Sequence, residues 1–456
     1  MTVRALEIEG YRGFAARHRL SLALPDGRPG SGLTIIVGPN NAGKSTIVEA
    51  LKMFGNNSPP SFPEGKRNKK AGDRIALRLE YGDGKECQLR TVVAGGSESE
   101  FDPQTGELQG FILALPSRRY FQPFFGRSSF GRQQYAINMS NLTVRSAAID
   151  TFAYRLFEVQ KNIDAFNQVL RRVIDPVPTW YIDQADSGNH YLKFETNGLF
   201  HNSDGLGDGL VSLLFLVDAL YDSQEGQLIA VDEPELSLHP ALQRRMANLL
   251  IEYAASRQIV VSTHSPYFVP LEALSNGATV VRVFTDATGS QVSQLTPQAA
   301  QALDGLLADL NNPHTLGLDA REVFFLEDRV ILVEGQEDVL LYPRMAKQLD
   351  MAFKGSFFGW GAGGADKMIA IASLLRDLGF QRVVGIVDGN RADVLQRLKA
   401  EFPQYQFTSI PTADIRSKPT VPEKPAVVGL LSSDGILKGE FRDAARTLVE
   451  TVNAAF

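Results

Sequence analysis

The chain has 456 residues, a length that allows two or three domains of about 150 residues each. Hydrophobic residues make up 44% and charged residues 21%, a globular composition that excludes collagen-like, low-complexity and wholly disordered chains. The formal charge of −6 argues against a surface that is basic throughout, although a local basic stripe for nucleic acid remains compatible with it.

The N-terminal part of the chain predicts alternating strands and helices. Residues 4–24 predict two strands joined by a turn, and residues 33–37 form a β-branched run typical of a buried parallel strand. Apolar residues share one face over 45–54, which indicates a helix, whereas the Pro-rich basic segment 56–72 predicts a mobile loop. Residues 75–93 alternate like a hairpin.

The alternation continues along the rest of the chain. The further predicted elements are helices at 147–173, 210–221 and from Pro240, strands at 228–231 and 258–261, a hairpin at 280–295, and strands at 330–333, 354–358 and 383–387. Helical, Ala-rich sequence after residue 297 separates two α/β blocks. The predicted domains are 1–296 with a globular insertion at about 55–200, a helical linker at 297–325, and 326–456.

Targeting and redox features are few. The single cysteine, Cys87, excludes an intramolecular disulfide and a cysteine-rich zinc site. The N-terminus reaches a charge at Arg4, too early for a signal peptide, and no run approaches the roughly 18 apolar residues that span a bilayer. We therefore expect a cytoplasmic protein with no membrane partner.

Residues 38–45 match the phosphate-binding pattern G-x-x-x-x-G-K-[ST] between the predicted strand and helix. The two glycines let the loop wrap a phosphate at the positive end of the helix. Lys44 would reach the β- and γ-phosphates of ATP, and Ser45 would hold Mg²⁺. The alternative is a Gly-rich turn without a ligand. The predicted nucleotide-binding residues are Gly38, Pro39, Asn40, Asn41, Ala42, Gly43, Lys44, Ser45 and Thr46.

Two acidic residues end the buried strand at 228–231. Asp232 would face the Mg²⁺, and Glu233 would orient and deprotonate the attacking water. Two acids alone are a common strand end. Together with the P-loop they predict a catalytic site in which Lys44 and Glu233 act on ATP.

These motifs resemble ATPases of the ABC type, in their RecF/SMC-like branch. The resemblance rests on Ile-Glu-Gly-Tyr-Arg-Gly-Phe at 8–14, Glu-Pro-Glu-x-x-Leu-His-Pro at 233–240 and Ser-Thr-His-Ser-Pro at 262–266. It implies that His264 contacts the γ-phosphate and that residues 237–240 touch a partner subunit. The alternative for His264 is a buried histidine with satisfied hydrogen bonds.

The resemblance also implies hydrolysis between two subunits, with a signature loop of one subunit facing the ATP of the other. The candidate loop is 203–209, directly before an apolar helix, although it departs from the familiar Leu-Ser-Gly-Gly-Gln form. Its nucleotide-binding residues would be Ser203, Gly205 and Gly207, and a Gly-rich helix cap is the alternative. We therefore expect a homodimer or higher oligomer, and slow hydrolysis by a monomer.

Acidic residues also follow two strands of the second domain. In a parallel sheet the strands' carboxyl ends share one edge, so Glu334 and Asp388 could face one site, with Asp338 nearby. Such carboxylates can hold Mg²⁺ or Mn²⁺ for phosphodiester cleavage, whereas the alternative is solvated strand-end acids.

This second domain resembles a TOPRIM domain, on the stretches 316–318, 332–338 and 359–367. Placed after the ATPase, it makes the chain similar to the overcoming-lysogenization-defect (OLD) family. TOPRIM nucleases usually carry Asp-x-Asp after the second strand, but here Asn390 replaces the second acid, which lowers metal affinity. Asp414-Ile415 is also followed by Arg416, where OLD-like proteins tend to place an acid.

The predicted fold class is α/β, an ABC-type P-loop ATPase with a globular insertion plus a C-terminal TOPRIM-like Rossmannoid domain. One hypothesis is a Mg²⁺-dependent OLD-like ATPase in DNA processing or anti-phage defence that cuts DNA itself. The other is an ATPase sensor and scaffold that binds and releases a separate effector protein. DNA and a phage-derived trigger are the further candidate partners.

A basic aromatic stretch has two interpretations of its own. No acidic residue lies between Glu107 and Asp150. Its arginines are Arg118, Arg119, Arg127, Arg132 and Arg145, and aromatic residues are interleaved with them. Arginines and aromatic rings together suit a nucleic-acid strand, but the aromatic residues equally suit the core of the insertion.

Overall fold

The computed structural model describes residues 1–56, 58–82, 84–103, 108–142, 149–196, 198–202, 207–296, 328–420 and 425–456. The chain divides into two compact units, unit 1 at Met1–Val292 and unit 2 at Ser293–Phe456. The helical linker predicted at 297–325 lies outside the described residues. Within the described ranges, no helix is both long and apolar enough to span a membrane.

Unit 1 is built on a central sheet in the order β14-β13-β3-β12-β11-β7. Its strands are β3 (Leu33–Val37), β7 (Ile112–Leu115), β11 (Leu228–Asp232), β12 (Gln258–Ser262), β13 (Thr279–Thr285) and β14 (Ser290–Gln294). Strands β13, β3, β12, β11 and β7 pair in parallel. The strands β3, β11 and β12 are buried along their whole length, as expected where both faces of a parallel sheet are covered. The carboxyl ends of these strands therefore lie along one edge.

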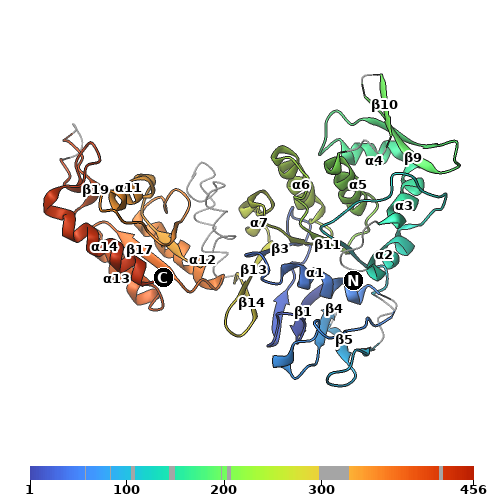
Figure 1. Cartoon of the computed structure of the whole chain (residues 1–456), viewed down its shortest axis with the longest axis horizontal. Helices are drawn as coiled ribbons and strands as arrows, with labels where there is room; N and C mark the ends of the chain where they lie inside the picture. The colour runs from blue at the N-terminus through green and yellow to red at the C-terminus, as the bar shows by residue number, and fades with distance from the viewer. Residues whose placement is uncertain are drawn as a thin grey trace. The chain divides into compact units, whose positions relative to one another are not determined.

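A second, antiparallel sheet in unit 1 has the order β2-β1-β4-β5-β6. Its strands are β1 (Val3–Glu9), β2 (His18–Ser21), β4 (Ala76–Tyr81), β5 (Lys85–Thr91) and β6 (Ser99–Asp102). Helix α1 (Lys44–Phe54) shares one hydrophobic core with this sheet and with the central sheet. In Figure 1, the blue strands β1, β4 and β5 lie beside α1. The predicted hairpin at 75–93 is therefore confirmed as β4 and β5, and it belongs to the sheet of β1.

The segment 56–72 is predicted from the sequence to be a mobile loop, but its described residues 58–72 pack against the rest of unit 1. Phe62 is fully buried, and its ring contacts Tyr11 edge to face with 5.7 Å between ring centroids. Asn68 Nδ2 donates a hydrogen bond to Arg12 O at 2.7 Å. A hydrophobic anchor inside a basic, Pro-rich segment thus fixes the loop beside the N-terminal motif.

Of the insertion predicted at about 55–200, the strands β4, β5 and β6 belong to the antiparallel sheet, and the described residues after β7 form three helices and a small sheet. These elements are α2 (Arg132–Asn141), α3 (Asp150–Gln160), α4 (Ile163–Leu170), β8 (Thr179–Gln184), β9 (His190–Thr196) and β10 (Leu199–Asn202). The strands form an antiparallel sheet in the order β10-β9-β8. Helix α5 (Asp208–Tyr221) then leads into β11, followed by α6 (Pro240–Tyr253) and α7 (Leu271–Leu274). Figure 1 shows α2, α3 and α4 on the side of unit 1 where α5 lies.

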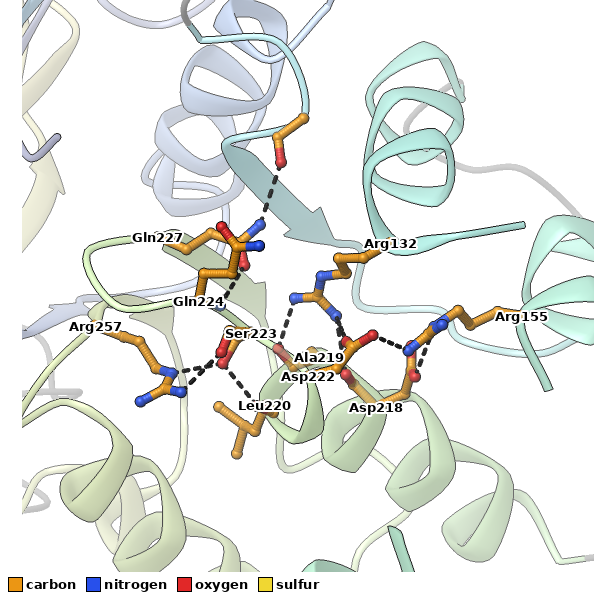
Figure 2. Close-up of polar contacts among 11 residues, drawn as sticks. Arg132, Arg155, Asp218, Ala219, Leu220, Asp222, Ser223, Gln224, Gln227 and Arg257 are labelled. Carbon is orange, nitrogen blue, oxygen red and sulfur yellow. Dashed lines mark hydrogen bonds and ion pairs between the residues drawn. The ribbon is translucent and has the colours of Figure 1, made fainter. Parts of the chain in front are cut away.

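Buried ion pairs fasten α5 to the insertion (Figure 2). Arg155 of α3 pairs with Asp218 of α5 and with Asp222, the residue directly after α5, and its Nε lies 3.0 Å from Asp218 Oδ1. Arg132 of α2 donates to Asp218 O and Ala219 O at 2.9 and 2.8 Å, and it also pairs with Asp222. The insertion and α5 therefore pack as one block.

Unit 2 contains a parallel sheet in the order β16-β15-β17-β18. Its strands are β15 (Val330–Leu332), β16 (Ser356–Phe357), β17 (Val383–Val387) and β18 (Gln406–Ser409), and a separate pair is β19 (Asp414–Arg416) and β20 (Gly429–Leu431). The helices are α11 (Gln336–Lys347), α12 (Met368–Asp377), α13 (Ala392–Glu401) and α14 (Arg442–Ala454). The strands β15 and β17, the pair β19 and β20, and the helices α11 and α14 enclose a hydrophobic core within this unit.

Candidate functional site

The loop between β3 and α1 has the backbone of a phosphate cradle. Gly38 and Gly43 have φ values of +137° and +113°, in the left-handed region that disfavours residues with a Cβ. A Cβ on Gly38 would also lie 1.9 Å from Val283 O of β13. Both glycines of the pattern are thus required by the backbone itself.

Lys44 begins α1, and its side chain folds over this loop. Its Nζ donates to Gly38 O and Pro39 O, each at 3.0 Å. Burial lowers the pKa of Lys44 to about 8, against weaker opposing effects of Glu233 and Asp232. The ammonium is therefore hydrogen-bonded to two loop carbonyls, a position from which it can turn to a phosphate.

Ser45 and Asp232 lie close together, although β3, which precedes Ser45, is separated from β11 by β12 in the sheet. Ser45 Oγ donates to Asp232 Oδ1 at 3.2 Å. Burial raises the pKa of Asp232, while its hydrogen bonds oppose that shift. A hydroxyl and a carboxylate oxygen are ligands that Mg²⁺ prefers, so this pair fits the Mg²⁺ of a bound nucleotide.

Glu233 follows Asp232 and has an unusual backbone. Its φ is +47°, a left-handed conformation, and its N–H donates to Ser262 O at 2.7 Å. Glu233 Oε1 lies 3.9 Å from His264 Nε2. Burial raises the pKa of the Glu233 carboxyl, and the neighbouring Asp232 raises it further.

His264 and Glu235 form the next part of the same edge. Burial lowers the pKa of His264 to about 4, and the nearby Lys44 lowers it further, so the imidazole is neutral at pH 7. Glu235 accepts hydrogen bonds from His264 N at 2.6 Å and from Thr263 Oγ1 at 2.8 Å. No role for Glu235 was predicted from the sequence, although the Glu-Pro-Glu triplet contains it. The carboxylate of Glu235 holds the backbone that carries His264.

One pocket of about 1080 Å³ is lined by Lys44, Ser45, Asp232, Glu233 and His264. The pocket brings together the P-loop, Asp232, Glu233 and His264, which the sequence places far apart. Further lining residues that the sequence analysis did not assign to ATP are Arg12, Glu49, Lys66, Ser117, Arg118 and Ser290. Arg12 Nη2 lies 2.8 Å from Glu49 Oε2, and Tyr11 OH donates to the same oxygen at 2.8 Å. The N-terminal motif at 8–14 therefore contributes to the wall of the pocket.

The candidate signature loop is only partly described. Ser203 and Gly205 lie outside the described residues, whereas Gly207 directly precedes α5 as its N-cap. A Cβ on Gly209 would lie 2.6 Å from Ser237 O, so the start of α5 packs closely on the loop at 237–240 of the same chain. Two segments with predicted inter-subunit roles are thus neighbours.

The basic aromatic stretch is divided between core and surface. Tyr120 and Arg127 are exposed, and Arg145 lies outside the described residues. Phe121, Phe125 and Tyr135 are buried, and Arg132 binds α5. Arg119 is only 6% exposed. These contacts favour the core interpretation for these residues, whereas Arg118 lines the pocket and Phe124 is exposed.

In unit 2 the predicted carboxylates lie at neighbouring strand ends. Glu334 follows β15, and its Oε1 accepts from Asp388 N after β17 at 2.8 Å. Asp338 Oδ2 accepts from Gly335 N at 2.8 Å, at the start of α11. Burial raises the pKa of Glu334; burial and neighbouring carboxylates raise that of Asp338 to about 7 and that of Asp388 to about 8.

This acidic group fits hard-cation chemistry, since crowded carboxylates repel one another unless protonated or bound to a cation. Among the described residues of the whole chain, however, no group of three or more His, Cys, Asp or Glu side chains is arranged to hold a metal ion. Asn390 is exposed, and Asp414, which contributes to the same electrostatic group, also pairs with Lys418.

The glycine cluster at 359–364 follows β16 and packs against the loop after β15. A Cβ on Gly361 would lie 2.6 Å from the Gly335 carbonyl carbon. Ala362 N donates to Val333 O at 2.9 Å, and Gly364 N donates to Glu334 O at 2.8 Å. The cluster thus lies against the backbone of Glu334.

Two family models match the chain. The AAA domain family described as "AAA domain, putative AbiEii toxin, Type IV TA system" matches residues 33–269, more than half of the chain. The TOPRIM domain of overcoming-lysogenization-defect-like proteins matches residues 325–389. These matches confirm the predicted fold class, with a P-loop ATPase domain followed by a TOPRIM-like domain.

Individual proteins are similar at low identity. The OLD nuclease of Thermus scotoductus is 24% identical over 378 residues, which cover 70% of each chain. The Septu protein PtuA of Bacillus thuringiensis is 22% identical over 367 residues, which cover 72% of this chain and 87% of that protein. A solved SMC head bound to the C-winged helix domain of ScpA is 14% identical with a TM-score of 0.45, and it covers 66% of this chain and 99% of that one.

Proposed function

Because the chain belongs to the AAA domain family whose model covers residues 33–269, we propose that it hydrolyses ATP in the pocket at the carboxyl ends of β3, β11 and β12. The observation that carries this proposal is the hydrogen bond between Ser45 and Asp232, because it joins the P-loop to the acidic strand end. A Gly-rich turn without a ligand would not require that partner.

We assign the roles as follows. Lys44 moves from the loop carbonyls to the β- and γ-phosphates, and His264, neutral because of burial, hydrogen-bonds to the γ-phosphate. Glu233 accepts a proton from the water that attacks in line. Ser45 and Asp232 would hold Mg²⁺, which supplies charge neutralisation of the phosphate oxygens.

The complete site would form between two copies of the chain. The surface that would face the γ-phosphate bound by a second subunit consists of Gly207 and the N-terminus of α5, together with Ser203 and Gly205. This proposal is supported by the family resemblance and by the packing of Gly209 against Ser237. It predicts that turnover per subunit rises with protein concentration through the dimerisation range.

We propose that unit 2 is an ATP-regulated DNA endonuclease in DNA processing or anti-phage defence. Its carboxylates Glu334, Asp338 and Asp388 are not arranged as a three-ligand metal site in this structure, so they would have to turn toward one another to hold Mg²⁺ or Mn²⁺. The metal would supply the charge stabilisation for phosphodiester cleavage. The match to the OLD-like TOPRIM family and the similarity to an OLD nuclease support this assignment.

A second candidate function is an ATPase sensor that holds and releases a separate effector protein. It is favoured by the present use of the carboxylates, since Glu334 and Asp338 both accept backbone N–H groups. The acid that TOPRIM nucleases place after the second strand is also replaced by Asn390.

Two experiments test these proposals: the first tests the ATP site, and the second separates the nuclease from the scaffold. First, Lys44→Ala should abolish binding of ATP and its turnover; unchanged affinity and turnover would contradict the ATP site. Second, plasmid DNA is incubated with the protein and Mg²⁺ or Mn²⁺, with Asp388→Ala as the control. Cleavage that Asp388→Ala abolishes supports the nuclease, whereas intact plasmid and co-purification of a second gene product support the scaffold.

A further inference from the structure

Arg119 is a buried arginine beneath the carboxyl edge of the central sheet. It lies in the loop after β7, and β7 pairs in parallel with β11, so this loop emerges beside Asp232. Burial lowers the pKa of Arg119 to about 10, partly offset by Glu235, Asp232 and Glu233, so the guanidinium stays charged at pH 7. A charge this deeply buried requires dense hydrogen bonding.

The hydrogen bonds of Arg119 converge on the catalytic strand end. Nη1 donates to Asp232 O at 2.8 Å, and Nη2 donates to Glu233 O at 3.0 Å. Nη1 also donates to Pro116 O at 2.9 Å, which fastens the loop itself. The planar fork therefore fixes two consecutive peptide carbonyls, a geometry that a lysine cannot reproduce.

Helix α5 orients the other side of the same guanidinium. Arg119 Nε donates to Ser212 Oγ at 3.1 Å, and Ser212 lies in α5, the helix that the candidate signature loop precedes. The side chain thus has one anchor in α5 and one at the strand end.

Glu233 needs such support because of its backbone. A left-handed φ in a residue other than glycine is sparsely populated and persists only where the surroundings hold it. The N–H of Glu233 donates to Ser262 O, and its carbonyl accepts from Arg119 Nη2 at 3.0 Å and from Leu236 N at 3.2 Å. Arg119 is the side chain among these partners. The direction of the Glu233 side chain depends on these hydrogen bonds.

We propose that Arg119 is a positioning residue for ATP hydrolysis, which aims the Glu233 carboxylate at the attacking water by fixing the backbone of Glu233. This inference rests on the proposed function, in which Glu233 is the general base. Arg119 itself does not line the pocket, and it contacts Asp232 at the peptide carbonyl, not at the carboxylate that would hold Mg²⁺. We therefore expect it to act through Glu233 and to leave nucleotide affinity unchanged.

The test compares Arg119→Gln and Arg119→Lys with a matched control, Arg132→Gln. Arg132 is also a largely buried arginine that donates to two backbone carbonyls, but these belong to the C-terminal part of α5 (Figure 2). The measurements are kcat with Mg-ATP, the Kd for a non-hydrolysed ATP analogue, and Tm for each variant. Arg119→Lys keeps the charge and serves if the glutamine variant does not fold.

We expect both Arg119 variants to lose about 10- to 100-fold in kcat, as for a misplaced catalytic group, while the Kd is unchanged. Arg132→Gln should lower Tm about as much as the Arg119 variants do, but it should leave kcat per folded molecule unchanged. The inference is overturned if the Arg119 variants keep the wild-type kcat. It is also overturned if the apparent kcat falls only as far as the fraction of molecules that bind the ATP analogue falls.

Glu233→Gln distinguishes this failure from failure of the proposed function. If Glu233→Gln abolishes turnover and the Arg119 variants do not reduce it, only the positioning role is wrong. If Glu233→Gln keeps wild-type turnover, the proposed general base is wrong and the role of Arg119 falls with it.

Discussion

The ion pair between Arg155 and Asp218 offers a quantitative test of how the insertion is attached. The side chains are 4% and 0% exposed, respectively. Arg155→Met would leave Asp218 buried without its closest positive partner, a change that typically destabilises a protein by about 3–5 kcal/mol. For a unit as large as Met1–Val292, that corresponds to a fall in Tm of about 6–10 °C, at about 2 °C per kcal/mol.

The pH dependence of this penalty has a defined sign. Burial raises the pKa of Asp218 to about 6, against the opposing charges of Arg155 and Arg132. Loss of Arg155 should raise it further, so Asp218 in the variant takes up a proton more readily than in the unfolded chain. A protonated carboxyl is not an uncompensated charge, and the destabilisation should therefore be smaller at pH 5 than at pH 8.

Urea or thermal unfolding followed by circular dichroism measures these effects. The control is Arg172→Met, because the pair of Arg172 with Glu252 is 42% and 55% exposed and should contribute about 0–1 kcal/mol. The double variant Arg155→Met/Asp218→Leu should recover most of the loss, since it removes both buried charges. A cost for Arg155→Met no larger than that for Arg172→Met would refute the reasoning.

Three further predictions follow from the same structure. Gly38→Ala should abolish nucleotide binding, because its Cβ would meet Val283 O, whereas Gly126→Ala has open space around its Cβ and no positive φ, and it should bind ATP normally in the same equilibrium assay. Cys87 should resist alkylation in the native protein at pH 8, because it is buried and burial raises the pKa of its thiol to about 11; labelling should appear with unfolding, and rapid native labelling would contradict its burial. Mn²⁺ should raise the Tm of unit 2 in the wild-type chain, and Asp388→Ala should remove that increase; an equal increase in both would exclude Asp388 as a ligand.

The sequence predicted those parts of the fold that have a strong local pattern. The strands at 33–37 and 383–387 were recognised because β-branched runs of that length are typical of buried parallel strands, and the structure confirms both. The strand β7 was missed, because Ile112–Leu115 is short and lies in an aromatic stretch without periodicity. Its partner β11 lies more than 100 residues away, so only tertiary pairing reveals it.

The candidate site divides in the same way. The P-loop residues and Asp232 are contiguous motifs, and their chemistry can be inferred from residue type and spacing. The position of Arg119 could not be inferred from the sequence, because an arginine among aromatic residues is equally typical of a nucleic-acid surface. Only the pairing of β7 with β11 brings its guanidinium under Glu233.

Steady-state turnover of Mg-ATP by Glu233→Gln, measured beside ATP-analogue binding, tests the central claim most directly. Glutamine keeps the size of the side chain and removes the base. The account predicts a fall in kcat of at least about 100-fold, the usual contribution of a general base, with nucleotide affinity retained. Turnover at the wild-type rate in this variant would contradict it.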